Sequence, residues 1–187
     1  MENNLPLLGN RRTDTLLGQT GFTLIEVLVT VAILIVLLSI AVPNFMTFVQ
    51  NSRLVGQTND LVTSLNYARS EAIKRGVRVS VCSRSSNTAC SAAGVSNWDT
   101  GWLVFVNPNN NAVADIGETV LQVRQPLENG NTLRTAGLQR VTYQNSGFSG
   151  NADTFRLCDS RGTENGRAIA VSMQGRVSTD TGTTACP

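Results

Sequence analysis

The most apolar stretch of the chain lies near its N-terminus, at residues 22–42. It reads FTLIEVLVTVAILIVLLSIAV, and Glu26 is its only charged residue. About 20 apolar residues form a helix long enough to cross a bilayer. Arg11 and Arg12 precede the stretch, so the positive-inside rule keeps the N-terminus in the cytoplasm. The pattern predicts one membrane-spanning helix, with the remainder of the chain exported.

The next stretch, residues 43–76, changes to a one-sided pattern. Its apolar and small residues recur at alternating steps of four and three: Leu54, Thr58, Leu61, Leu65, Ala68 and Ala72. This spacing predicts that the helix continues and packs one face on a sheet. Pro43 cannot donate a main-chain hydrogen bond, so we expect a kink near Val42. Gly76 is the expected end of a helix running from about Phe22 to about Arg75.

Beyond Gly76, short alternating runs are separated by Gly, Asn, Ser and Pro, which is typical of an antiparallel β domain. The predicted strands are Val77–Cys82, Gly101–Val106, Thr119–Arg124, Gln139–Tyr143, Thr154–Leu157 and Arg167–Ser172. The residues 107–111, NPNNN, predict a turn or loop between the second and third strands.

Composition narrows the chemistry that the chain can perform. Its 187 residues suit one globular domain, and its 15 basic and 13 acidic residues nearly balance. It contains no histidine, which excludes Ser-His-Asp and Cys-His catalysis and His-ligated zinc. No nucleophile–base pair stands at a usable spacing. We therefore expect a protein that is not an enzyme, has no small-molecule substrate and needs no cofactor or metal.

One polar segment weakly resembles a calcium loop, because Asn107, Asn109, Asn111, Asp115 and Glu118 carry oxygen atoms at suitable spacing. A hard cation prefers several carboxylates, and this segment supplies only two, both late in the run. The pattern favours a polar surface turn.

The four cysteines, Cys82, Cys90, Cys158 and Cys186, allow three pairings, among which the sequence alone does not choose. An exported domain lies in an oxidising compartment, which favours disulfides over metal ligation. We expect the two local pairs, Cys82 with Cys90 and Cys158 with Cys186.

An ordinary secretory signal is the alternative to a membrane anchor, with a small-x-small cleavage site at Ser39-Ile40-Ala41. The apolar run exceeds the usual length of about 7–15 residues, and Glu26 would be costly inside it. The residues 21–26, GFTLIE, followed by the apolar helix and then Pro43, instead resemble the class III signal of type IV pilins and type II secretion pseudopilins.

This resemblance implies that a membrane peptidase cuts between Gly21 and Phe22 and methylates the new amino terminus. The chain would then divide into a leader at 1–21, which is long for the family, a membrane and filament-core helix at 22–42, a second helical half at 43–76 and a β-rich periplasmic head at 77–187. A carboxylate in an apolar helix needs a cation or a proton. The family implies that Glu26 pairs with the free amino group of a neighbouring subunit and sets the axial register.

Three further blocks resemble the GspH/FimT group of minor pilins: YARSEAI at residues 67–73, WDTGWLVFV at 98–106 and GRV at 175–177. The implied fold is α+β, a long N-terminal α-helix packed against an antiparallel domain of two sheets. The implied role is structural, in type IV pilus biogenesis, at the tip or in the initiation complex. The implied partners are minor and major pilins, the prepilin peptidase and the inner membrane. The subunit would cross that membrane once and later enter the pilus fibre.

Two other roles stay open: a type II secretion pseudopilin, and a DNA-binding minor pilin for natural transformation. Some GspH/FimT members bind DNA through a basic C-terminal patch containing G-R-x-R, but here Ser178 takes the place of the second arginine. The candidate DNA contacts are Arg161, Arg167 and Arg176, extended by Lys74, Arg75 and Arg78. The alternative is that these arginines only solvate one face of a sheet.

Overall fold

A computed structural model of the chain describes residues 21–92, 96–111, 115, 117–183 and 185–186. The predicted leader, except for Gly21, lies outside the described residues. The helix α1 covers Leu24–Arg75, and eight strands follow in this part of the chain. They are β1 Val79–Ser83, β2 Trp102–Val106, β3 Val120–Val123, β4 Thr132–Arg134, β5 Arg140–Tyr143, β6 Asp153–Cys158, β7 Arg167–Val171 and β8 Val177–Thr181.

The hydroxyl groups in and just before the first part of α1, residues 24–44, form hydrogen bonds with the helix main chain. The hydroxyl of Thr23 caps the helix by accepting a hydrogen bond from the main-chain N–H of Glu26 at 3.3 Å. The hydroxyls of Thr30 and Ser39 donate to carbonyl oxygens three residues earlier, at 2.9 and 2.7 Å. Every residue from 21 to 48 is exposed. By length and composition, the helix is able to cross a membrane.

The helix runs through Pro43 without a break in helical structure. The side-chain amide of Asn44 donates to the carbonyl oxygen of Ile40 at 2.9 Å, beside the point where Pro43 lacks an N–H group. The kink near Val42 stays a prediction.

The second part of α1, from Phe45 to Arg75, packs inside the head. All six residues of the predicted stripe are buried, together with Ser64 and Glu71. Gly76 follows with a positive φ of 68°, a conformation that glycine adopts at low cost and that ends the helix.

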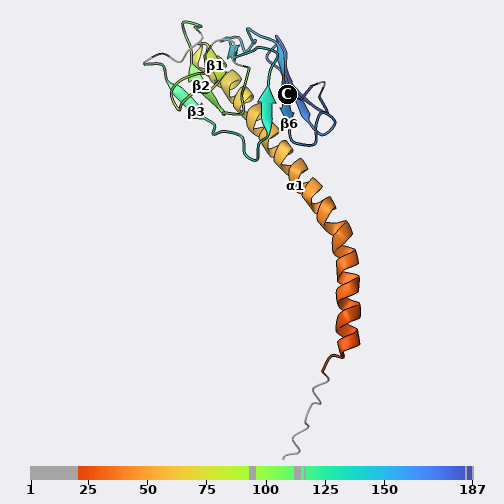
Figure 1. Cartoon of the computed structure of the whole chain (residues 1–187). Coiled ribbons are helices and arrows are strands. Elements are labelled where there is room, and N and C mark those ends of the chain that lie inside the picture. Colours follow the sequence, from red (N-terminus) through yellow and green to blue (C-terminus); the bar gives the residue numbers. More distant parts are fainter. Residues whose placement is uncertain (1–20, 93–95, 112–114, 116, 184, 187) are drawn as a thin grey trace, which may run out of the picture. The chain divides into compact units, whose positions relative to one another are not determined.

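The head contains two four-stranded antiparallel sheets (Figure 1). The first has the order β3-β2-β1-β5 and the second β4-β6-β7-β8. The predicted fold class, a long N-terminal helix with two antiparallel sheets, is confirmed.

The core lies between the buried face of α1 and one face of each sheet. Trp98 and Phe155 meet edge to face with ring centroids 4.8 Å apart, and the indole N–H of Trp98 donates to the carbonyl oxygen of Leu138 at 2.9 Å. The two tryptophans of the WDTGW block, Trp98 and Trp102, are therefore packing residues.

A smaller apolar cluster covers the other face of the first sheet. It contains Cys82, Cys90, Leu103 and Phe105. The disulfide between Cys82 and Cys90 belongs to this cluster, and a second disulfide joins Cys158 to Cys186. Each disulfide closes a loop within the head.

Two strands were not predicted from the sequence, β4 and β8. The three-residue β4 buries only Leu133. The residues of β8 are almost all exposed, so they show no apolar alternation. Strand β8 is an edge strand, held by main-chain pairing with β7 from Arg167↔Thr181 to Val171↔Val177. Strand β8 could have been predicted from the turn residues that precede it and from its β-branched residues.

Candidate assembly signal and cationic surface

The predicted cleavage point lies outside regular secondary structure. Gly21, Phe22 and Thr23 precede the first helical residue, Leu24, and the side chain of Phe22 is 82% exposed. A Cβ atom added at Gly21 would meet nothing within 4 Å. Gly21 and Phe22 are both exposed and lie before the helix, so a cut between them would not require the helix to unfold.

Glu26 stands in the first turn of α1, where a negative charge is favoured by the helix dipole. Its main-chain N–H is capped by Thr23, but no cationic group among the described residues forms an ion pair with its carboxylate. An apolar environment would make this carboxylate costly unless a cation from another molecule approached it.

Arg69, inside the YARSEAI block, joins three elements of the head. Its Nε donates to the carbonyl oxygen of Gly147 at 3.0 Å, and its Nη2 donates to that of Gln174 at 3.2 Å. These carbonyls belong to the β5–β6 and β7–β8 connections. Arg69 is therefore a positioning residue, which the sequence analysis did not single out.

Gly175, the glycine of the C-terminal GRV block, lies where a side chain does not fit. It has a φ of +74°, and a Cβ atom there would lie 2.2 Å from the carbonyl oxygen of Gly147. The two connections that Arg69 joins thus touch at a place where only glycine fits.

Arg161 is occupied by contacts within the chain. Its Nε and Nη2 donate to Oδ2 of Asp159 at 2.9 and 2.7 Å, and Nη2 also donates to Oδ1 of Asn51 at 2.9 Å. Its remaining nitrogen, Nη1, is buried. Burial alone raises the pKa of the Asp159 carboxyl, but the hydrogen bonds and charge of Arg161 outweigh it and hold that pKa below its usual range. Arg161 ties the second sheet to α1.

Four other candidate cations also have partners. Arg167 donates to the carbonyl oxygens of Asn165 and Gly166, and Arg78 donates to that of Pro108 at 3.3 Å. Arg75 and Lys74 lie 2.5 and 3.8 Å from the carboxylate oxygens of Glu71. The hydrogen bond from Arg75 is the main cause that holds the pKa of the Glu71 carboxyl below its usual value. Despite these pairs, the side chain of Lys74 is 78% exposed and that of Arg75 is 41% exposed.

Arg176 is exposed, and no described residue makes a side-chain hydrogen bond or ion pair with it. It stands beside the β7–β8 turn, which Arg69 holds against α1 through Gln174. Arg161, in contrast, contacts α1 at Asn51. Asn51 and Arg69 are 18 residues apart, or about 27 Å along a helix. The structure does not bring Arg161 and Arg176 together in one patch.

Two family models match the chain. The model described as the prokaryotic N-terminal methylation motif matches residues 16–42. The model described as type II transport protein GspH matches residues 57–175, more than half of the chain. The chain belongs to the GspH family. The match includes Arg69 and Gly175 and ends one residue before Arg176.

The GspH-family fold also resembles solved structures. Two crystal forms of the type IV minor pilin FimU from Pseudomonas aeruginosa strain PAO1 match at 20% sequence identity. One covers 70% of this chain and 97% of FimU with a TM-score of 0.55, and the other covers 75% and 99% with a TM-score of 0.59. None of the curated protein sequences compared with the chain matches it. The chain is a minor pilin or pseudopilin, with an N-terminal apolar helix suited to anchor it in the inner membrane and its head outside.

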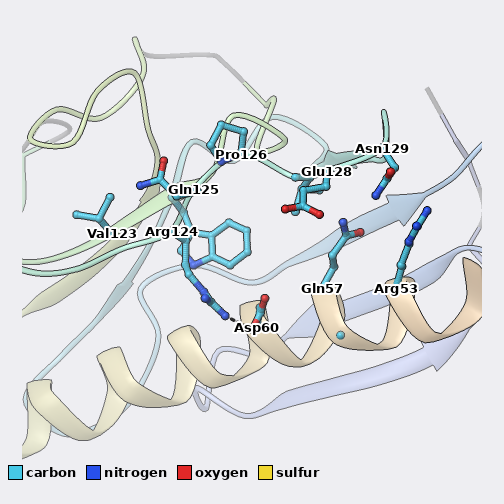
Figure 2. A pocket seen from close by; sticks show the side chains of 12 residues that line it. Arg53, Gln57, Asp60, Val123, Arg124, Gln125, Pro126, Glu128 and Asn129 are labelled. Atoms are coloured by element: carbon cyan, nitrogen blue, oxygen red, sulfur yellow. Dashed lines mark hydrogen bonds and ion pairs between the residues drawn. The ribbon is translucent and has the colours of Figure 1, made fainter. Parts of the chain in front are cut away.

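One open cavity of about 390 Å³ lies between α1 and the segment that follows β3 (Figure 2). Arg53, Gln57 and Asp60 contribute to it from the helix, and Arg124 and Glu128 from that segment. Arg124 forms an ion pair with Asp60 across the cavity (Figure 2). The pair holds the β3–β4 connection against the helix of this GspH-family head.

Among the described residues, no three His, Cys, Asp or Glu side chains are grouped closely enough to hold a metal ion. A metal site in that part of the chain would therefore need ligands of other kinds, such as amide or main-chain oxygens.

Proposed function

We propose that this GspH-family chain is a non-enzymatic minor pilin that works by packing into a type IV pilus, at the tip or in the initiation complex. The observation that carries the proposal is the first part of α1, which is mostly apolar and exposed on all sides. Its only charged residue is Glu26, which forms no ion pair with any described residue. Burial of this part must come from a membrane or from other subunits.

In this account the prepilin peptidase cuts the exposed bond between Gly21 and Phe22 and methylates the amino group of Phe22. The carboxylate of Glu26 in one subunit then pairs with that amino group in a neighbour. Because such a pair replaces two unpaired charges in an apolar medium, it strongly favours one axial register. Pro43 would provide a flexible joint between the filament core and the head, which stands in the periplasm before assembly.

Assembly into a type IV pilus is supported by the likeness to FimU, which is described as a type IV minor pilin. The partners are then other minor and major pilins. Arg69 fixes two loops of the head beside the last turns of α1, and the β head is the surface available to other minor pilins.

The test compares Glu26→Gln with Gly21→Val in a strain that lacks the native chain. Gly21→Val should abolish cleavage, because the peptidase requires glycine there. Glu26→Gln should leave cleavage intact, measured by mass spectrometry of the N-terminus, and reduce the chain in sheared filaments at least about tenfold. Normal incorporation of Glu26→Gln would overturn the proposal.

A type II secretion pseudopilin is the second candidate, favoured by the description of the matching family model as a type II transport protein. Deletion of the chain separates the two machines. Loss of surface pili and twitching with normal protein secretion supports the pilus. Loss of secretion with normal pili supports the secretion system.

DNA capture for natural transformation is the third candidate, favoured by the exposed cations Arg176, Lys74 and Arg75 at one end of the head. The chain in detergent micelles would be titrated with duplex DNA across salt concentrations. Arg176→Ala should weaken binding and lower the salt slope by about one. Arg161→Met, whose guanidinium already has protein partners, is the control and should leave the slope unchanged. No binding at low salt would exclude this role.

A further inference from the structure

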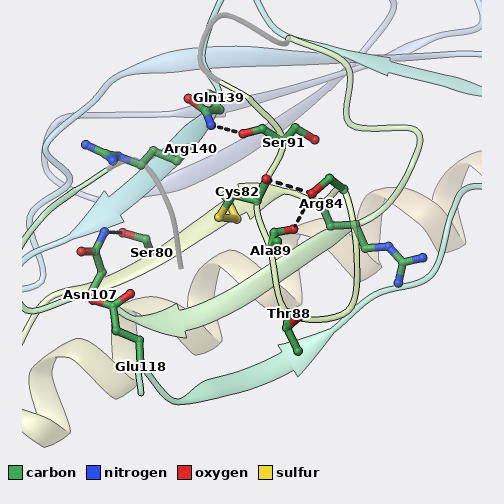
Figure 3. The surroundings of a disulfide bond; sticks show 12 residues. Ser80, Cys82, Arg84, Thr88, Ala89, Ser91, Asn107, Glu118, Gln139 and Arg140 are labelled. Atoms are coloured by element: carbon green, nitrogen blue, oxygen red, sulfur yellow. Dashed lines mark hydrogen bonds between the residues drawn. A yellow bond between two sulfur atoms is a disulfide. The ribbon is translucent and has the colours of Figure 1, made fainter. Parts of the chain in front are cut away.

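The head exposes few large apolar side chains, and three of them lie close together. Among the described residues after Phe48, the exposed ones are Val55, Tyr67, Ile73, Phe148 and Met173. Ile73, Phe148 and Met173 are 53%, 53% and 51% exposed. The smaller apolar cluster on the first sheet, which contains the Cys82–Cys90 disulfide (Figure 3), is buried in contrast. An exposed apolar cluster on a folded head is typical of an interaction site.

Three segments of the chain meet at this place: the last turns of α1, the β5–β6 connection and the β7–β8 turn. A Cβ atom added at Gly147 would lie 2.8 Å from Cδ1 of Ile73, so Ile73 packs against the residue that precedes Phe148. The main-chain N–H of Ser149, which follows Phe148, donates to the carbonyl oxygen of Met173 at 3.0 Å. The three exposed apolar residues are therefore neighbours in space, although they are far apart in the sequence.

The main chain beneath these side chains is held in place by contacts within the head. Arg69 donates to the carbonyl oxygens of Gly147 and Gln174, one in each connection. The two connections also touch, because a Cβ atom at Gly175 would lie 2.2 Å from the carbonyl oxygen of Gly147. A surface that is fixed before binding loses less conformational entropy when a partner docks.

The charges beside the apolar side chains are almost all positive. Residues 67–78, 144–150 and 172–176, the three segments that meet here, contain five basic residues and one acidic residue. The acidic residue is Glu71, whose carboxylate already pairs with Lys74 and Arg75. The side chain of Lys74 is still 78% exposed, and Arg176 is exposed without a side-chain partner among the described residues.

We propose that this surface is the docking site for the head of another pilin subunit that presents apolar side chains surrounded by carboxylates. We call it the apolar–basic patch and define it by Ile73, Phe148, Met173, Lys74 and Arg176. The cations select an acidic rim on the partner, because opposite charges across an interface favour the correct partner and repel others. The inference rests on the proposed function, since it names the surface through which the packed subunit contacts a neighbour.

The composition of the patch favours a protein over duplex DNA. Phosphate groups are bound by basic and polar groups, so a DNA backbone would leave Phe148 and Met173 facing water. Protein interfaces combine an apolar centre, enriched in aromatic residues and methionine, with a polar rim and arginine. A partner head can cover both the apolar centre and the cations, which a phosphate backbone cannot do.

Lys74 makes the patch chemically addressable, because it is the only lysine in the chain. A carbodiimide joins an amine to a carboxylate in contact with it, and the reagent takes up the water that is lost. Sheared filaments and inner membranes from a strain that carries this chain are treated with the reagent. We expect an amide between Lys74 and an Asp or Glu side chain in the head of another pilin, identified by mass spectrometry of the linked peptides.

Two controls accompany this reaction. The amide between Lys74 and Glu71 of the same chain shows that the amine has reacted, since the two groups lie 3.8 Å apart. Lys74→Arg keeps the positive charge but removes the amine. It should abolish the linked product and leave the amount of the chain in filaments unchanged.

The apolar part of the patch is tested with a matched pair of variants. Phe148→Ser should lower the yield of the linked product at least about fivefold, because it removes the aromatic centre of the patch. Val55→Ser removes an exposed apolar side chain outside the patch and should leave the yield unchanged.

The charges are tested in the same way. Arg176→Glu should lower the yield at least about fivefold, because it opposes the acidic rim of the partner. Arg53→Glu makes the same change at an exposed position of α1, about 30 Å along the helix from Ile73, and should leave the yield unchanged. The Tm of each variant, read from the core residues Trp98 and Trp102, should equal that of the unchanged chain.

Two results would overturn the proposal. One is the absence of any linked product between chains where the amide between Lys74 and Glu71 does form. The other is an undiminished yield in Phe148→Ser. Duplex DNA that binds the unchanged chain and Phe148→Ser equally, without a linked product, would assign the cations to phosphate instead. A linked product in membranes, with the chain missing from filaments, would support the patch and contradict the proposed function alone.

Discussion

The two parts of α1 obtain their burial in different ways. In the first part, residues 24–44, every side chain is exposed, although most are apolar. In the part that follows, Leu54, Leu61, Leu65, Ala68 and Ala72 are completely buried. The first part is mostly apolar on all sides, with Glu26 as its only charged residue, and the second carries an apolar stripe on one face. A stripe matches a surface that the same chain supplies, whereas an all-round apolar helix needs a membrane or other subunits.

The largest expected difference comes from placing the same charge in each part. Leu65→Asp buries an unpaired carboxylate in the core and should cost about 5 kcal/mol or more, enough to unfold the head. Leu34→Asp should leave the Tm of the head in detergent unchanged, but oppose membrane insertion by about 2.5–3.5 kcal/mol. Thermal melts and membrane fractionation measure the two effects. Equal Tm losses would erase the distinction between the parts.

Disulfide removal should destabilise only the head and the second part of α1. The loops closed by Cys158–Cys186 and Cys82–Cys90 have sequence separations of 28 and 8. Chain entropy predicts losses of about 3.5 and about 2.5 kcal/mol for the respective double alanine variants. Denaturant unfolding followed by tryptophan fluorescence measures both, with the helical signal of the detergent-bound first part as the internal control. The opposite order would contradict the entropic estimate.

Arg161→Met tests the contact that joins the second part of α1 to the second sheet. It should cost about 2 kcal/mol at pH 7, because it removes charged hydrogen bonds to Asp159 and Asn51. The pKa of Asp159 is lower in the folded chain than the unfolded value of about 3.9. Its contribution is therefore present above that value and is lost as the pH falls through the folded pKa. Unfolding at pH 7 and pH 3 should show the difference between the two proteins shrinking at pH 3.

The smallest effect is an increase in stability. Gly56 lies inside the second part of α1, and a Cβ atom there meets nothing within 4 Å, so Gly56→Ala should stabilise the head by up to about 1 kcal/mol. Gly175→Ala is the matched control and should destabilise it, because its Cβ would collide with the carbonyl oxygen of Gly147. A loss of stability in Gly56→Ala, read from the Tm, would mean that helix propensity does not govern this position.

The sequence predicted what depends on local patterns. The step of four and three from Leu54 to Ala72 predicted the buried stripe, and the glycine at 76 predicted the end of α1. The edge strand β8 was not predicted, because main-chain pairing with β7 holds it in place and its side chains are not buried.

Contacts between residues far apart in the sequence could not be predicted from local sequence patterns. Arg69 contacts Gly147, 78 residues away, and Arg161 contacts Asn51, 110 residues away. No periodicity encodes such pairs, so Arg161 looked like a surface cation and Arg69 received no role. The residues at the N-terminal signal were found because they stand side by side in the sequence.

The central claim is that the first part of α1 is buried by other subunits, with Glu26 paired to a neighbour's amino terminus. A photocrosslinking amino acid in place of Val29, about one helical turn from Glu26, tests it in cells. The account predicts crosslinks to the first residues of another pilin, lost in Glu26→Gln and in the uncleaved Gly21→Val. Undiminished crosslinks in either variant would contradict it.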